Sequence, residues 1–201
     1  MANQRIIELI EQINKRKEGR DSIAATYRDS PDLKELAELV SLEKDLSFTY
    51  DVLVFISEQY ESMGRFSVAA IFRLNALKIA KGLDKDFNEM LYVILRDRNY
   101  YVDDDCDDVR AIVDKLLPKE NIEKRFNAIK QRPRSLKHDP VEMSEEYLAV
   151  IDEVEEKIDQ NRTLYGMGSC HEIWALKYDY LLEKGIDWKS PQALNPRVMF
   201  D

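Results

Sequence analysis

The chain has few of the side chains that form covalent cross-links or bind transition metals. Its 201 residues include two cysteines and two histidines. Cys106 and Cys170 are far apart and no CxxC pair occurs, so the sequence predicts neither a disulfide framework nor a zinc finger. We expect both thiols to be reduced, and we expect no metal site and no cofactor.

Long apolar runs are also missing. The most apolar stretch, Val52–Ile56, is five residues long, whereas a membrane-spanning helix needs about 20. The N-terminal residues enter an amphipathic pattern directly and lack the apolar core of a secretory signal. These absences predict a soluble cytoplasmic protein that does not enter a membrane.

Local catalytic motifs are absent as well. The sequence contains no P-loop, dinucleotide-binding glycine pattern, serine nucleophile elbow, HExxH or kinase signature. Their absence weakens the case for an enzyme. Catalysis by carboxylates needs no local motif, however, and the chain has 39 acidic residues.

The charge balance is acidic, with a net charge of −9. Such a protein repels phosphate backbones at long range, so we do not expect general nucleic-acid binding. Hydrophobic residues make up 44% of the chain and charged residues 34%, as in a folded domain rather than a disordered one. One domain, residues 1–201, is expected, with a weak candidate boundary at the proline-containing segment 132–140.

Apolar residues recur at spacings of three and four along the whole chain, which predicts helices almost everywhere. We expect an all-α fold, an irregular bundle or short α-solenoid of about eight to ten helices. The expected helices span 2–17, 30–43, 47–64, 65–81, 85–101, 106–117, 120–131, 144–158 and 169–184, with a short helix after residue 21. The predicted N-caps and stops are Ser30, Ser47, Ser144 and Ser169, and Gly64 and Gly185.

The C-terminal segment 186–201 is predicted to fold back onto the helices, with Trp188 and Phe200 buried against the helix 169–184. Gly185 permits the chain to reverse, and two prolines in the segment reduce the entropy lost on docking. Its apolar residues also need a surface to cover.

Residues 50–83 form a candidate repeat. Large and small residues stand where two antiparallel helices pack closely: Leu53, Ile56, Tyr60, Gly64, Phe66, Ala69, Ala76 and Leu77. In this pattern the segment resembles a tetratricopeptide repeat, which implies recognition of a peptide or protein on a concave helical surface. Ser57, Arg73 and Lys81 depart from the family pattern, and the register decays in the residues that follow. Any short-looped helical hairpin selects similar residues, and this alternative stays open.

The segment 168–178 is the densest in chemically active side chains. We predict a ligand-binding site formed by His171, Trp174, Lys177 and Tyr178. A ligand could stack on the aromatic rings of this helix, with an anion at its N-terminus. The alternative is that Cys170 and Trp174 pack under the C-terminal segment. Cys170 and His171 are adjacent and project about 100° apart, so they cannot form a catalytic dyad.

Two clusters of like charge lie at the ends of expected helices. The basic run 124–137 contains the candidate anion-binding residues Lys130, Arg132, Arg134 and Lys137. It could bind RNA, phosphate or an acidic partner, but it lacks interleaved aromatic residues, so a solvated helix end is the alternative. The acidic cluster 103–108 does not fit an EF-hand and favours a helix N-terminus.

From these patterns we expect a noncatalytic module that binds a protein or peptide. An acidic inhibitor of a basic toxin or nuclease is one version of that function. The alternatives are an enzyme that uses carboxylates or the His171 region, and a module that binds RNA or phosphate through the basic run.

Overall fold

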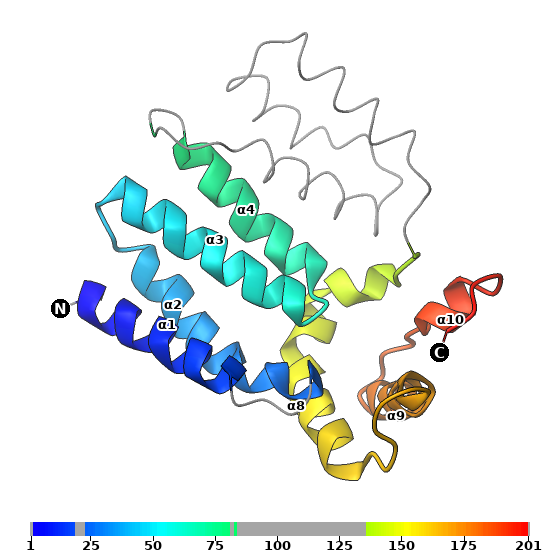
Figure 1. Ribbon diagram of the computed structural model, residues 1–201. Coiled ribbons are helices and arrows are strands. Elements are labelled where there is room, and N and C mark those ends of the chain that lie inside the picture. Colours follow the sequence, from blue (N-terminus) through cyan, green and yellow to red (C-terminus); the bar gives the residue numbers. More distant parts are fainter. Residues whose placement is uncertain (1, 19–22, 81–82, 84–135, 201) are drawn as a thin grey trace, which may run out of the picture.

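The computed structural model describes residues 2–18, 23–80, 83 and 136–200. This part of the chain contains seven α-helices, two 3-10 helices and no strand (Figure 1), which confirms the all-α class. The count is below the expected number, and the helices expected at 85–101, 106–117 and 120–131 lie outside the described residues. None of the helices described is long and apolar enough to cross a bilayer.

The described elements follow one another in two groups along the chain. The first group is α1 (Ala2–Glu18), the 3-10 helix η1 (Ile23–Asp29), α2 (Ser30–Val40), α3 (Leu46–Ser62) and α4 (Phe66–Ala80). The second group is the 3-10 helix η2 (Pro140–Met143), α8 (Glu145–Asn161), α9 (Ser169–Glu183) and α10 (Pro191–Leu194). In Figure 1, α1 to α4 form one body, and α8 leads away from it toward α9 and α10.

The first core lies among α1, α2, α3 and α4. In α1, Ile6, Leu9 and Ile13 are fully buried, and their spacing of three and four places them on one side of the helix. Leu33 and Leu36 of α2 join them by the same spacing. Hydrophobic periodicity predicts these three positions of α1, but it also assigns Ile7 to the buried side, and Ile7 is 42% exposed.

The hairpin predicted at 50–83 is present as α3 and α4. Gly64 has a φ of 73°, in the left-handed region that favours glycine, and it lies where the chain reverses between the two helices. The rings of Tyr60 and Phe72 stack with centroids 5.6 Å apart. Arg73, a departure from the tetratricopeptide pattern, is buried and paired with Glu61. The structure thus confirms the hairpin, while the family likeness remains a resemblance.

A second core forms where α8 meets α9 and the C-terminal segment. Ile151, Val154 and Ile158 of α8 are buried against Leu181 of α9 and against Trp188. Trp188 is 1% exposed, which confirms the prediction that the C-terminal segment packs on the helices. Burial of a side chain of this size contributes on the order of 2–3 kcal/mol.

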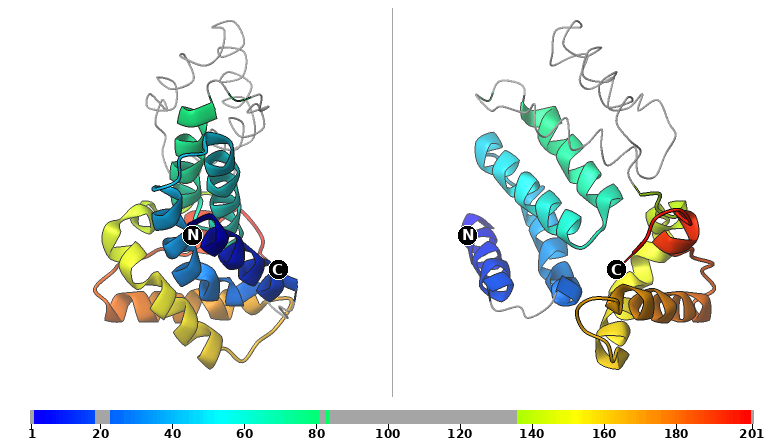
Figure 2. Two further views of the ribbon diagram at one scale, coloured as in Figure 1. Left: turned by 90° about the vertical axis from the view of Figure 1, so that its left-hand side faces the viewer. Right: turned by 45° about the vertical axis from the view of Figure 1, so that its right-hand side comes forward.

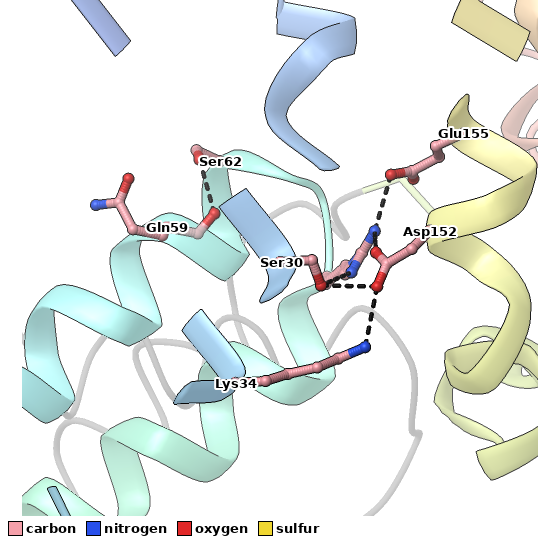
Figure 3. Close-up of polar contacts among 7 residues, drawn as sticks. Ser30, Lys34, Gln59, Ser62, Asp152 and Glu155 are labelled. Atoms are coloured by element: carbon pink, nitrogen blue, oxygen red, sulfur yellow. Dashed lines mark hydrogen bonds and ion pairs between the residues drawn. The ribbon is translucent and has the colours of Figure 1, made fainter. Parts of the chain in front are cut away.

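An ion-pair cluster links the two cores. Arg65, immediately before α4, is 7% exposed, and its Nη2 lies 2.7 Å from Asp152 Oδ1 and 2.8 Å from Glu155 Oε2 of α8. Figure 3 shows that Ser30 and Lys34 of α2 also contact the carboxylate of Asp152. Ser30 Oγ donates to Asp152 Oδ2 at 2.8 Å, and Lys34 Nζ donates to it at 3.1 Å. The cluster therefore ties α8 to α2 and to the turn before α4.

Two helix starts in the first group differ from the prediction. Ser30 is the first residue of α2 rather than its N-cap, because its hydroxyl is used in the bond to Asp152. Ser47 lies inside α3, since Asp45 Oδ1 already accepts from the backbone N–H groups of Ser47 and Phe48 at 2.9 and 3.1 Å. Asp45, an equally good capping residue two positions earlier, takes the N-cap position. α2 also ends at Val40 rather than at residue 43.

In the second group one cap is confirmed and one is wrong. Ser144 Oγ accepts from the backbone N–H of Tyr147 at 3.2 Å, as predicted for α8. Ser169 begins α9 but does not cap it, because its hydroxyl donates to the carbonyl of Gly166 at 2.7 Å. Gly168 stands at the N-cap position instead, with a φ of 82°.

Candidate functional site on helix α9

Helix α9 carries all four predicted ligand-binding residues. The loop before it is held by Glu172, whose Oε1 accepts from Thr163 Oγ1 at 2.6 Å and whose Oε2 accepts from the backbone N–H of Leu164 at 2.7 Å. These hydrogen bonds from Thr163 and Leu164 lower the pKa of Glu172. The loop and the first turn of α9 therefore form one ordered unit.

His171 is used to hold the C-terminal segment. Its Nδ1 lies 3.2 Å from Gln192 Oε1, and its Nε2 lies 3.2 Å from the carbonyl oxygen of Phe200. The imidazole also meets the edge of Trp174, with centroids 5.6 Å apart. Both ring nitrogens are thus within hydrogen-bond distance of partners in this chain, and a ligand would have to displace one of them.

Trp174 packs against the last residues of the chain. The Phe200 ring meets it edge-on, with centroids 5.0 Å apart and an interplanar angle of 89°. Phe200 is only half-buried, so the prediction that it is buried like Trp188 was too strong. The reason is geometric, because a residue at the end of a docked segment is covered from one side. The alternative interpretation, in which Trp174 packs under the C-terminal segment, fits these contacts.

Lys177 points toward the second core. Its Nζ lies 5.4 Å from the Tyr147 ring centroid and 5.2 Å from that of Trp188, within the range of cation–π contacts. Burial by itself would lower the pKa of Lys177, but nearby Tyr147, Glu155 and Glu142 outweigh that effect and raise it. A raised pKa favours the charged form of the amino group, which is the form that pairs with carboxylates and aromatic rings.

Glu142 and Tyr147 complete the surroundings of Lys177, and the sequence analysis missed both. Glu142 Oε1 accepts from Trp188 Nε1 at 2.7 Å, and its Oε2 lies 3.6 Å from His138 Nδ1. Burial would raise the pKa of Glu142, yet His138, Lys177 and Trp188 together lower it. Burial raises the pKa of Tyr147 to about 12. No local spacing relates residues 142, 147 and 177, so only the fold brings them together.

Tyr178 lies apart from Lys177 and is exposed to solvent over 41% of its surface. The four predicted residues therefore have different surroundings, and a ligand site formed by them stays a prediction. His171 and Trp174 contact the C-terminal segment, the amino group of Lys177 lies near the Trp188 ring of the second core, and Tyr178 faces solvent. Successive residues of a helix project about 100° apart, which separates 177 from 178.

The predicted anion-binding site cannot be assembled from the described part of the chain. Lys130, Arg132 and Arg134 lie outside it, as does the acidic cluster 103–108. Lys137 is exposed, and its backbone N–H donates to Asn195 Oδ1 at 2.8 Å while Asn195 Nδ2 donates back to its carbonyl at 2.9 Å. Residue 137 of the candidate boundary segment is therefore tied to the C-terminal segment.

In the ranges that the structure describes, no three His, Cys, Asp or Glu side chains are grouped closely enough to hold a metal ion. Cys170 is half-buried, and the neighbouring His171 faces Gln192 and Phe200.

Comparison of the chain with protein-family models, with curated proteins and with solved structures finds no match. The likeness of α3 and α4 to a tetratricopeptide repeat gains no support from these comparisons and stays a prediction.

Proposed function

We propose that this chain is a noncatalytic protein-interaction module whose partner is another protein or a peptide. The observation that carries the proposal is the number of large apolar side chains that are exposed on α9 and on the segments next to it in the chain. They occur in the loop before it, on the helix and in the C-terminal segment: Leu164, Tyr165, Met167, Tyr178, Leu182, Val198 and Met199. Single exposed apolar residues are ordinary on a protein surface, whereas a group of them marks an interaction site.

The loop contributes the most exposed members of this group. Met167 is 90% exposed, although the loop that carries it is held by Glu172. Arg162 lies over the Tyr165 ring at 4.5 Å and restricts that ring too. A surface that is apolar and already ordered loses little conformational entropy when a partner binds, which favours association.

The polar groups of the region support binding rather than catalysis. Lys177 has a raised pKa and faces aromatic rings, and Tyr147 has a pKa near 12. A general base or nucleophile needs a pKa closer to neutral and access to its substrate. The hairpin of α3 and α4 adds the peptide-binding surface that its resemblance to a tetratricopeptide repeat implies.

Reconstitution with a purified partner tests this proposal. The full chain, immobilised, captures proteins from cells of its source, and each captured protein is then produced separately and titrated against the free chain by calorimetry. We expect one protein to bind in a stoichiometric complex, with the negative heat-capacity change of apolar burial. Failure of every captured protein to bind in the titration, together with turnover of a small substrate, would favour the enzyme alternative.

A further inference from the structure

The outer face of α9 carries a continuous stripe of exposed residues. His171, Ala175, Tyr178 and Leu182 are all exposed, and their spacing of four, three and four residues aligns them along one side of the helix. Leu181, three residues after Tyr178, lies beside this stripe and is buried in the second core. In both views of Figure 2, α9 lies at the edge of the molecule. His171 is engaged by Gln192 and Phe200 of the C-terminal segment, so the part of the stripe left for a partner is Ala175, Tyr178 and Leu182.

A line of carboxylates runs beside this stripe. Glu172, Asp179 and Glu183 follow one another at spacings of seven and four residues, so they share the side of α9 next to Tyr178 and Leu182. Asp179 is exposed and makes no ion pair or hydrogen bond with the described residues. Glu183 is paired with Lys157 at 2.6 Å but remains 59% exposed. The apolar stripe thus has an acidic border.

We infer that this face of α9 binds a cationic amphipathic helix of the partner protein. Resting on the protein-binding function proposed above, the inference names the surface and the chemistry of its occupant. Apolar residues of the incoming helix would cover Ala175, Tyr178 and Leu182, and its Lys or Arg residues would lie over Glu172 and Asp179. Ala175 leaves room for two helices to approach closely, as small residues do at helix crossings.

Charge decides between this occupant and a second copy of the chain. Two copies would each bring a net charge of −9 to the contact, and two α9 helices would place acidic borders near each other. Like charges brought together across an interface oppose association, whereas a basic partner is attracted and oriented by the same field. The acidic border therefore selects a cationic partner.

A pair of synthetic peptides tests the inference on the full chain. One peptide carries leucines at helical spacing with lysines elsewhere, and the other has glutamate in place of each lysine; both match the 15 residues of α9 in length. Binding is measured by fluorescence anisotropy of labelled peptide, at low and high salt. We expect the lysine peptide to bind, to weaken as salt rises, and to bind more tightly than the glutamate peptide.

Four variants locate the binding surface. Leu182→Lys and Asp179→Lys should each weaken binding of the lysine peptide by about tenfold or more. Their controls are Leu42→Lys, at an exposed leucine after α2, and Asp187→Lys, at an exposed aspartate outside α9. Each control repeats the charge change of its test variant and should stay within about twofold of the wild type.

The inference would be overturned by equal binding of both peptides, by equal weakening of binding in test and control variants, or by a dimer in sedimentation that Leu182→Lys dissociates. It would also be overturned if Leu182→Lys leaves the reconstituted natural complex unaffected. In that last case the protein-binding function stands and its surface lies elsewhere, so the two proposals fail separately.

Discussion

Trp188 Nε1 donates a hydrogen bond of 2.7 Å to Glu142 Oε1, and this bond joins the C-terminal segment to the 3-10 helix η2. The indole is 1% exposed, so its polar N–H would be left unsatisfied in the core without this partner. One residue thus supplies both apolar packing and a polar anchor for the end of the chain.

Removal of the indole tests how much the C-terminal segment stabilises the fold. We expect Trp188→Ala to lower the free energy of unfolding by about 3–5 kcal/mol, because a fully buried ring is replaced by a cavity. Trp188→Phe keeps much of the apolar volume and should cost less. Urea denaturation followed by circular dichroism measures both, and a loss of under about 1 kcal/mol for Trp188→Ala would contradict this packing.

The link between the two cores depends on Arg65. Arg65→Met removes the buried cation and leaves Asp152 and Glu155 together, so we expect the free energy of unfolding to fall by about 3–5 kcal/mol. Lys34 also pairs with Asp152 but is 62% exposed, and Lys34→Met should cost only about 0–1 kcal/mol. If urea denaturation gives similar losses in the free energy of unfolding for the two variants, the buried ion pair stabilises the fold no more than the exposed one.

Stability should fall in acid. The pKa of Asp152 is lowered because Arg65, Ser30 and Lys34 outweigh the opposing effect of burial, and the pKa of Glu142 is lowered by its own partners. A lowered folded-state pKa stabilises the protein fully above the unfolded-state pKa, and this stabilisation is lost as pH falls through the folded-state value.

The free energy of unfolding should therefore decrease as pH drops below about 4.3. Urea denaturation between neutral pH and the acid range measures the slope, and Glu142→Gln should reduce it. An identical slope in this variant would show that Glu142 does not contribute.

The loop before α9 should depend on Glu172. Because its carboxylate accepts from the backbone N–H groups of Thr163 and Leu164, Glu172→Ala should speed hydrogen exchange at these two amides. Glu156→Ala, at an exposed glutamate of α8, is the control and should leave them unchanged. Unchanged exchange in Glu172→Ala would mean that the loop is held by other contacts.

The helices of the described region were largely predictable because their signals are local. α1 was expected at 2–17 and spans Ala2–Glu18, and Ser144 caps α8 as predicted. Apolar spacing and a capping hydroxyl act within one or two turns, so the sequence alone carries that information. The cap predicted at Ser30 was wrong because Asp152, distant in sequence, binds the same hydroxyl.

The candidate site could not be predicted in the same way. The residue types in α9 marked it correctly as a helix rich in polar and aromatic side chains, and that much the sequence determined. Which side of α9 is covered depends on how α8 and Trp188 pack against it, and this separates the half-buried Lys177, whose amino group lies near the Trp188 ring, from Tyr178 at the surface. Only the tertiary structure decided these roles, because burial and ion pairing depend on contacts between residues far apart in the chain.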